Sequence, residues 1–331
     1  MTPRNAILPL AKLTLTEIPR QPGFLLLVTT LLLFIGSLPF LLTHNLGEPG
    51  KPVRDSAMAV MFLGALLVSA TASCSAVGGE IRRGTAGAIL SKPISRTRFL
   101  VAKFLGVAAV MLVFALLCTL ALIMADRAAS QPFRIHWPFL LPIHASVAGG
   151  YLLAALINYF TRRPFGSTAF WAMAGLLLLA FFWTLTQSGA PRLDPQTAAA
   201  QPDLLLDTLP VRWALFPACL LLTLAALMLQ SLAMFCALRL PIVPTLTLCG
   251  GLFLLGLMSD YLLAARAATQ LWARLLYILL PNWQHFWMAD ALAQNGTIPW
   301  DYVLHAGGYA LSWTLGLFCL TLAAFERMEV R

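Results

Sequence analysis

Eight apolar runs of about 20 residues recur along this 331-residue chain, and they constrain its fold more than any other feature. A helix rises 1.5 Å per residue, so about 20 apolar residues cross the roughly 30 Å hydrocarbon core of a bilayer. The predicted spans are residues 24–42, 57–77, 100–124, 139–160, 167–186, 213–237, 243–263 and 302–325. Only 11% of the residues are charged, whereas about 25% are charged in a typical soluble domain. We therefore expect an all-α integral membrane protein, a polytopic helical bundle of about eight transmembrane helices.

The seventh predicted span has an alternative interpretation. Pro241, Pro244 and the pair Gly250 and Gly251 interrupt its beginning. If spans six and seven formed a re-entrant hairpin, the core would have six spans, and both termini would keep their side of the membrane. Because apolar residues are spread over the whole chain, residues 1–331 are expected to form a single transmembrane domain.

Residues 1–23 are expected to carry an interfacial N-terminal helix. Within them a short segment places Ile7, Ala11 and Leu15 on one helical face and Lys12 on the other. The segment is too short and too polar to cross a bilayer. This pattern is typical of a helix that lies in the membrane surface.

Residues 264–300 are expected to form external amphipathic helices. Leu271, Leu275 and Leu279 repeat at helical spacing opposite Arg274, and Pro281 then breaks the pattern before a second short helical piece.

The distribution of Lys and Arg predicts the orientation. With the N-terminus in the cytoplasm, 14 of the 22 Lys and Arg residues fall on the cytoplasmic side, and 9 of the 13 acidic residues fall on the other. This bias follows the positive-inside rule, so both termini are predicted to be cytoplasmic. The net charge of +9 is thus explained by topology in the lipid bilayer, and no nucleic-acid partner is expected.

Motifs that would make the chain an enzyme are absent from the sequence. There is no P-loop, no HExxH zinc motif and no GxSxG nucleophile motif. The five histidines stand singly near span edges, so no metal site is expected. We predict no catalytic, cofactor-binding or metal-binding residues, and any ATP must be bound by another subunit.

An ion-coupled secondary transporter is the main alternative function. It would need carboxylates deep in the membrane, whereas Asp126, Asp260 and Asp301 lie near predicted span edges. Lys103 and Arg239 also lie near edges, where long basic side chains reach the membrane surface. A carrier built on Asp260 remains an alternative, and an intramembrane enzyme lacks a paired nucleophile and base.

The connector between the second and third spans, residues 78–99, is the most specific segment. It is rich in charged residues, which are Glu80, Arg82, Arg83, Lys92, Arg96 and Arg98. Residues 84–91 could form two helical turns, and Pro93 then imposes an extended step. Two interpretations are open: the connector anchors the two spans in register, or a cytoplasmic partner binds it and moves the spans.

Three stretches of this connector carry a resemblance to a known family. EIRRGT at residues 80–85, ILSKPISR at 89–96 and FLVAKFLG at 99–106 resemble the first cytoplasmic loop of type-2 exporter permeases of ABC transporters. In that family an acidic residue and Gly-Thr precede a Leu-Ser-x-Pro-x-Ser-Arg turn. The N-terminal helix, the external helices and the final residues 325–327 add a looser similarity.

The resemblance implies the membrane-spanning permease subunit of an ATP-driven ABC exporter in the cell (inner or plasma) membrane. It makes residues 78–99 a cytoplasmic coupling loop on which a separate ABC ATPase subunit docks. A second permease copy or a paralogue would complete a dimer. The residues to which the resemblance assigns ATPase docking are Glu80, Arg82, Arg83, Gly84, Thr85, Ser91, Pro93 and Arg96. The family core has six spans, whereas eight are predicted here.

Overall fold

The computed structural model describes residues 7–42, 50–82, 95–130, 135–187, 211–267 and 269–328. Every regular element in these ranges is helical, which confirms the predicted all-α fold. Seven helices among them are long and apolar enough to cross a membrane. They are Pro22–Leu41 (α2), Lys51–Arg82 (α3 to α4), Arg96–Ala128 (α6), Trp137–Thr161 (α7), Phe165–Thr186 (α8), Leu215–Ala237 (α10) and Trp300–Glu326 (α14).

The remaining predicted span, residues 243–263, corresponds to a shorter apolar helix. This helix, α11, covers the 16 residues Ile242–Leu257, which is a rise of about 24 Å. A π-helical turn, Asp260–Ala264 (η5), follows it. Pro241 is the N-cap of α11 and Pro244 lies in its first turn, where the backbone N–H groups have no partner within the helix. The prolines in this predicted span therefore mark the beginning of a helix.

Several of the long helices extend past the apolar runs that predict them. α6 begins at Arg96 and has 33 residues, so its first turns contain charged side chains. A helix continues beyond the apolar core because its backbone hydrogen bonds do not depend on the side chains outside the bilayer. Charged residues next to a predicted span, such as Arg96 and Arg98, therefore lie within the same helix as the span.

The described helices divide into two compact units. Unit 1 contains Met1–Val28, Met61–Ala115 and Pro217–Arg331, and unit 2 contains Thr29–Val60 and Leu116–Phe216. Four helices, α2, α3, α6 and α10, contribute residues to both units.

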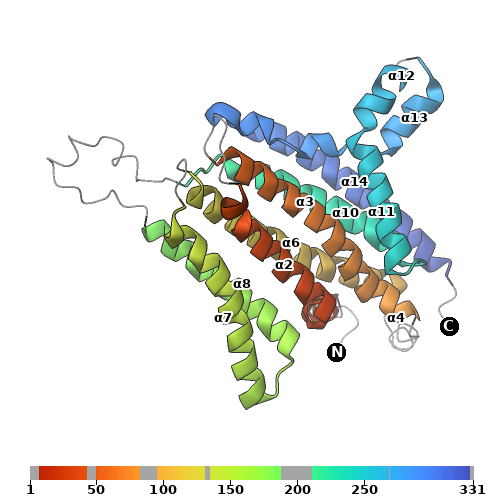
Figure 1. Cartoon of the computed structure of the whole chain (residues 1–331). Coiled ribbons are helices and arrows are strands. Elements are labelled where there is room, and N and C mark those ends of the chain that lie inside the picture. Colours follow the sequence, from red (N-terminus) through yellow and green to blue (C-terminus); the bar gives the residue numbers. More distant parts are fainter. Residues whose placement is uncertain are drawn as a thin grey trace. The chain divides into compact units, whose positions relative to one another are not determined.

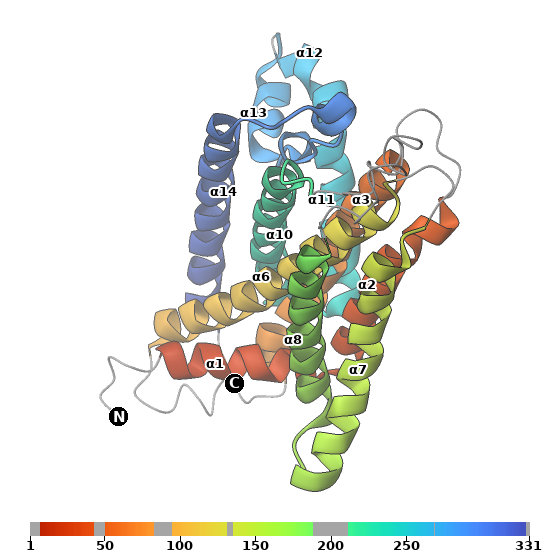
Figure 2. The ribbon, with the colours of Figure 1, turned by 90° about the vertical axis from the view of Figure 1, so that its left-hand side faces the viewer.

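Two short helical regions lie at opposite ends of unit 1. Figure 1 shows α11 leading into α12 (Ala265–Ala267) and α13 (Leu271–Leu279). Figure 2 shows α1 (Ile7–Glu17) lying crosswise at the other end of α10 and α14.

Close contact between α1 and α6 requires a glycine. A Cβ atom on Gly106 would lie 2.6 Å from the Cβ of Thr14 and 2.9 Å from the carbonyl oxygen of Ala11. Such distances are too short for any side chain, so Gly106 lets α1 lie directly on α6. The face of α1 that packs there contains the buried residue Thr14, and Ile18, which directly follows α1, is buried too.

The segment after α13 packs around a buried tryptophan. Trp283 has no exposed surface, and its ring lies 5.8 Å from that of Phe253 in α11 and 6.2 Å from that of Phe62 in α3. A Cβ on Gly256 would overlap the carbonyl oxygen of Pro281. The second helical piece predicted after Pro281 consists of two 3-10 helices, Trp283–Phe286 (η6) and Asp290–Asn295 (η7).

In unit 2, α7 and α8 form an antiparallel pair. α7 ends at Thr161, and the next residue, Arg162, adopts the left-handed conformation with φ 56°. The pair is close because Gly150 has no side chain, and a Cβ there would lie 2.8 Å from Met173 backbone atoms. The hydroxyl groups of Thr29 and Tyr151 lie 2.8 Å apart and connect α2 to α7.

Candidate functional site

The predicted docking loop follows a change of helix geometry at the end of α3. After Ser73 the helix widens into the π-helical turn Cys74–Gly78 (η3) and then forms α4 (Gly79–Arg82). A Cβ on Gly78 would lie 2.7 Å from the carbonyl oxygen of Ala237 at the end of α10. π-helical turns inside α-helices occur frequently at functional sites. Here the turn places Glu80 and Arg82 at the start of the loop.

Lys103 is buried and bonded to the first of these residues. Its side chain has no exposed surface, and its Nζ lies 2.5 Å from Glu80 Oε1 and 3.9 Å from Glu17 Oε2. An ammonium group buried without such partners would be strongly unfavourable. We expected Lys103 to reach the membrane surface, but its side chain is buried against Glu80, which is 17% exposed, and close to Glu17, which is 43% exposed. The contact joins α6 to α4 and α1.

Arg82 connects the loop to the turn between α10 and α11. Its Nη1 donates a hydrogen bond of 3.3 Å to the carbonyl oxygen of Leu240. Thr245 Oγ1 donates to the same carbonyl at 3.4 Å. The start of the loop thus contacts the beginning of α11 as well as α6.

The other end of the loop is bonded to the last helix. Arg96 Nη1 donates to the carbonyl oxygens of Glu326 and Met328, both at 2.8 Å. The ring of Phe99 stacks on that of Phe325 with centroids 5.8 Å apart. The last carbonyls of a helix have no partner within it, and a cation there is favourable. Arg96 therefore caps α14.

The structure describes only the flanks of the predicted docking site. Five of its residues lie outside the described residues, and these are Arg83, Gly84, Thr85, Ser91 and Pro93. The three described ones do not form one cluster. Glu80 contacts α6, Arg82 contacts the α10–α11 turn and Arg96 contacts α14.

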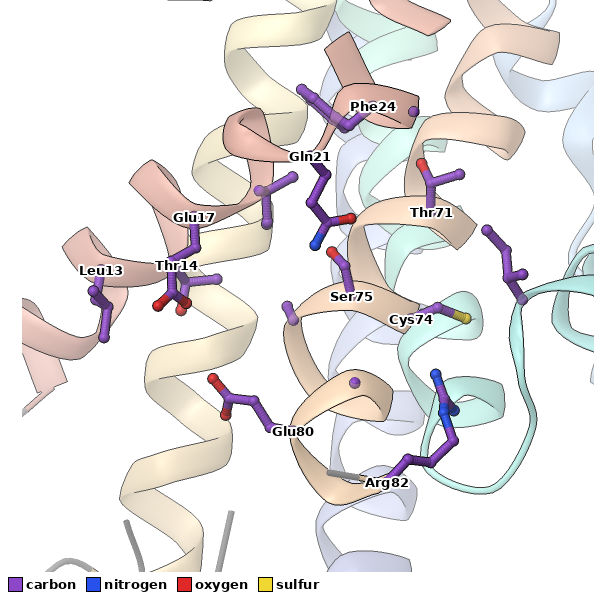
Figure 3. Close-up of a pocket in the computed structure, with 15 residues that line it drawn as sticks. Leu13, Thr14, Glu17, Gln21, Phe24, Thr71, Cys74, Ser75, Glu80 and Arg82 are labelled. Atoms are coloured by element: carbon purple, nitrogen blue, oxygen red, sulfur yellow. The ribbon is translucent and has the colours of Figure 1, made fainter. Parts of the chain in front are cut away.

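A cavity of about 710 Å³ lies between α1 and the end of α3. Figure 3 shows polar side chains from both sides lining it. Those from α1 and the residues after it are Thr14, Glu17 and Gln21, and those from α3 to α4 are Thr71, Ser75, Glu80 and Arg82. In the described part of the chain, no group of three or more His, Cys, Asp and Glu residues could hold a metal ion. The lining is suited to polar contacts.

Asp260, the residue on which a carrier could be built, takes part in a hydrogen-bond network. Its Oδ1 accepts from Tyr277 Oη at 2.7 Å and from Asn282 Nδ2 at 2.8 Å. The backbone N–H of Asn282 donates to Tyr309 Oη in α14 at 3.0 Å. Donation to the carboxylate raises the pKa of Tyr277. These contacts connect η5 to α14, and they do not favour the carrier alternative.

Sequence reasoning missed Lys103 and Glu17 as members of this site. The available signal was Lys103, the only charged residue in the predicted apolar span 100–124. Its partner Glu80 lies 23 residues away and Glu17 lies on a separate helix. Spacing along one helix could not have paired them.

The fold and the loop together define the class of this protein. The described residues contain seven helices of membrane length, so the chain is a multi-pass membrane protein, and residues on both flanks of the loop are bonded to other helices. The sequence matches the profile of the ABC-2 family transporter proteins over residues 34–330, so the chain belongs to this family and is an ABC-2 type permease subunit. Membership implies partnership with an ABC ATPase subunit. Neither a search of curated proteins nor a search of solved structures found a match.

Proposed function

We propose that this permease subunit belongs to an ATP-driven exporter and that a separate ATPase docks on the loop between Glu80 and Arg96. ATP is bound and hydrolysed in the ATPase, because this chain has no P-loop. Residues 1–331 act as one permease domain in the inner or plasma membrane. The loop and both termini are cytoplasmic, and a second copy or a paralogue completes the translocation path.

One observation supports this proposal above the others: each flank of the loop is bonded to a different helix. Glu80 is bonded to Lys103 in α6, and Arg96 is bonded to the end of α14. A loop that served only as an anchor between the second and third spans would not need contacts with α14 or the α10–α11 turn.

The contacts also indicate how movement would spread. Packed helices shift as rigid bodies, and a displacement at one end is carried along the helix. A force on the loop would act on α6 through Lys103 and on α14 through Arg96. Movement of these helices would open the path between the two permease copies to alternate sides.

The docking step is tested by reversing charges in the loop. The tagged chain is purified from its native membranes, and co-purified proteins are labelled with 8-azido-ATP and identified by mass spectrometry. We expect Arg83→Glu/Lys92→Glu to lose the ATP-labelled partner. The matched control is Arg20→Glu/Arg163→Glu, which reverses two exposed cations that are predicted to lie on the same side but outside the loop.

Equal recovery of the ATPase with both double variants would contradict docking on this loop. The predicted orientation is tested separately by Arg83→Cys in a background without the native cysteines. Labelling by a membrane-impermeant maleimide from the outside of intact cells would place the loop on the wrong side and end the proposal.

A further inference from the structure

Helix α1 divides the space beside α6 into two different cavities. Thr14 and Ile18 face the protein, and the polar cavity with Glu17 lies on one flank of the helix. The opposite flank forms a groove of about 810 Å³. Its lining residues are Ile7, Leu8, Pro9, Ala11, Lys12 and Leu15 of α1 and Leu105, Gly106 and Ala109 of α6.

The lining of this groove combines apolar surface with a single charge. Eight of its nine residues have no polar side-chain atom, and the ninth is Lys12. Leu8 is 66% exposed and Leu105 is 49% exposed, so apolar surface is open at the groove. The carboxylates of Glu17 and Glu80 belong to the cavity on the other flank. The groove therefore favours an amphiphile with a negative charge.

An apolar strip continues from the groove along α6. Leu105, Ala109 and Leu112 are spaced by four and three residues, so they share one face of the helix. Leu105 and Leu112 are each 49% exposed, and they are separated by a rise of about 10 Å. Because α6 is long and apolar enough to cross the membrane, this strip is exposed apolar surface that an acyl chain can cover.

From this geometry we infer that the groove binds one anionic phospholipid. Its phosphate contacts the ammonium of Lys12, and one acyl chain lies over Leu105, Ala109 and Leu112. Phosphate is a preferred partner of Lys, and an acyl chain covers the exposed leucines. The lipid would fill the angle between α1 and α6 and hold α1 in place. The inference depends neither on ATPase docking nor on the direction of transport.

The test uses the purified full-length chain in phosphatidylcholine vesicles that contain a small fraction of phosphatidylglycerol with a photoactivatable acyl chain. After illumination, mass spectrometry maps the adducts. We expect adducts on residues 105–112, with much weaker labelling by a phosphatidylcholine probe that has the same chain. Lys12→Gln should lower labelling by the anionic probe about fivefold, the factor that one cation near a membrane surface contributes. Lys12→Arg should preserve it.

Two further variants distinguish specific lipid binding in the groove from non-specific attraction of anionic lipid to the protein surface. Ala109→Trp fills the groove and should remove the adducts even though Lys12 is present. Arg20→Gln removes an exposed cation of the same N-terminal segment that does not line the groove, and it should leave labelling unchanged. Equal labelling by the two probes, unchanged labelling in Lys12→Gln, or an equal loss in Arg20→Gln would each overturn the inference in favour of bulk lipid or diffuse surface charge.

Discussion

The ammonium of Lys103 lies 2.5 Å from the carboxylate of Glu80, although 23 residues separate them in the chain. The lysine side chain has no exposed surface and that of Glu80 is 17% exposed. Both flank the loop that we propose as the ATPase docking site. The pair is therefore placed to keep α4 in contact with α6 when a docked ATPase exerts force on the loop.

Removing one partner of this pair should be more harmful than removing both. Lys103→Met removes the cation that contacts the largely buried Glu80 carboxylate, and breaking a buried pair in this way costs about 3–5 kcal/mol. Lys103→Met/Glu80→Gln removes both charges of the pair, and the remaining neighbour Glu17 is 43% exposed to solvent. The thermal unfolding temperature of this double variant in detergent should therefore lie closer to that of the native chain.

The same variants separate stability from coupling. The double variant should still bind the ATPase but stimulate ATP hydrolysis less, because the link from α4 to α6 is lost. A double variant that is as unstable as Lys103→Met, or that couples normally, would show that the pair does not have this role.

Gly106 should control whether α1 stays on α6. Gly106→Leu forces a side chain into the space of Thr14 and Ala11, and overpacking of this kind costs about 1–3 kcal/mol. The measurement is maleimide labelling of a cysteine placed at Ile18, which is 1% exposed. Labelling should accelerate in Gly106→Leu. The control is Gly316→Leu in α14, where a Cβ meets nothing within 4 Å, and faster labelling in both variants would contradict the prediction.

Arg96 should hold the end of α14 through the shape of its guanidinium. Arg96→Lys keeps the charge, but its shorter side chain does not place an N–H group where Nη1 of the guanidinium donates to the carbonyls of Glu326 and Met328. We expect hydrogen exchange over residues 320–328 to accelerate in Arg96→Lys and in Arg96→Ala. Native protection in Arg96→Lys would mean that charge alone, and not the capping geometry, stabilises the end of the helix.

Tyr277 should make the stability of the hydrogen-bond network around Asp260 sensitive to alkaline pH. Its pKa is raised in the folded protein because it donates to the Asp260 carboxylate. A raised pKa means that the contribution to stability is complete below the ordinary tyrosine value of about 10 and is lost as pH rises through the raised value. Thermal unfolding of the native chain should therefore show an added alkaline loss.

Tyr277→Phe is the variant that identifies the group. It should lower stability at neutral pH by about 1 kcal/mol, the usual value of one hydrogen bond, and it should remove the alkaline loss. Tyrosinate absorbance during a pH titration provides the independent reading. An alkaline loss of the same size in Tyr277→Phe would assign it to another group.

The apolar runs predicted the seven membrane-length helices because helix formation in lipid is a local requirement. A chain that crosses hydrocarbon must satisfy its backbone hydrogen bonds within the same segment. Length and hydropathy therefore sufficed for α2, α7, α8 and α14. The family could also be predicted from local sequence, because the pattern of its loop is contiguous at residues 80–106.

The site could be predicted only in part. Glu80, Arg82 and Arg96 were identified as loop residues, but sequence reasoning assigned them to a partner protein and not to contacts within the chain. The structure bonds Glu80 to Lys103 and Arg96 to the end of α14. No periodicity in the sequence encodes which helices lie side by side.

The sequence by itself determined that the chain is a helical membrane protein of the ABC-2 family, because apolar length and a contiguous motif are local properties. Only the tertiary structure decided that Lys103 is buried between two carboxylates, that Arg96 caps α14 and that α1 lies on Gly106 with a groove beside it. Those features depend on packing between segments that are distant in the chain. Their physical cause is the need to pair buried charges and helix ends with whatever groups the neighbouring helices bring close.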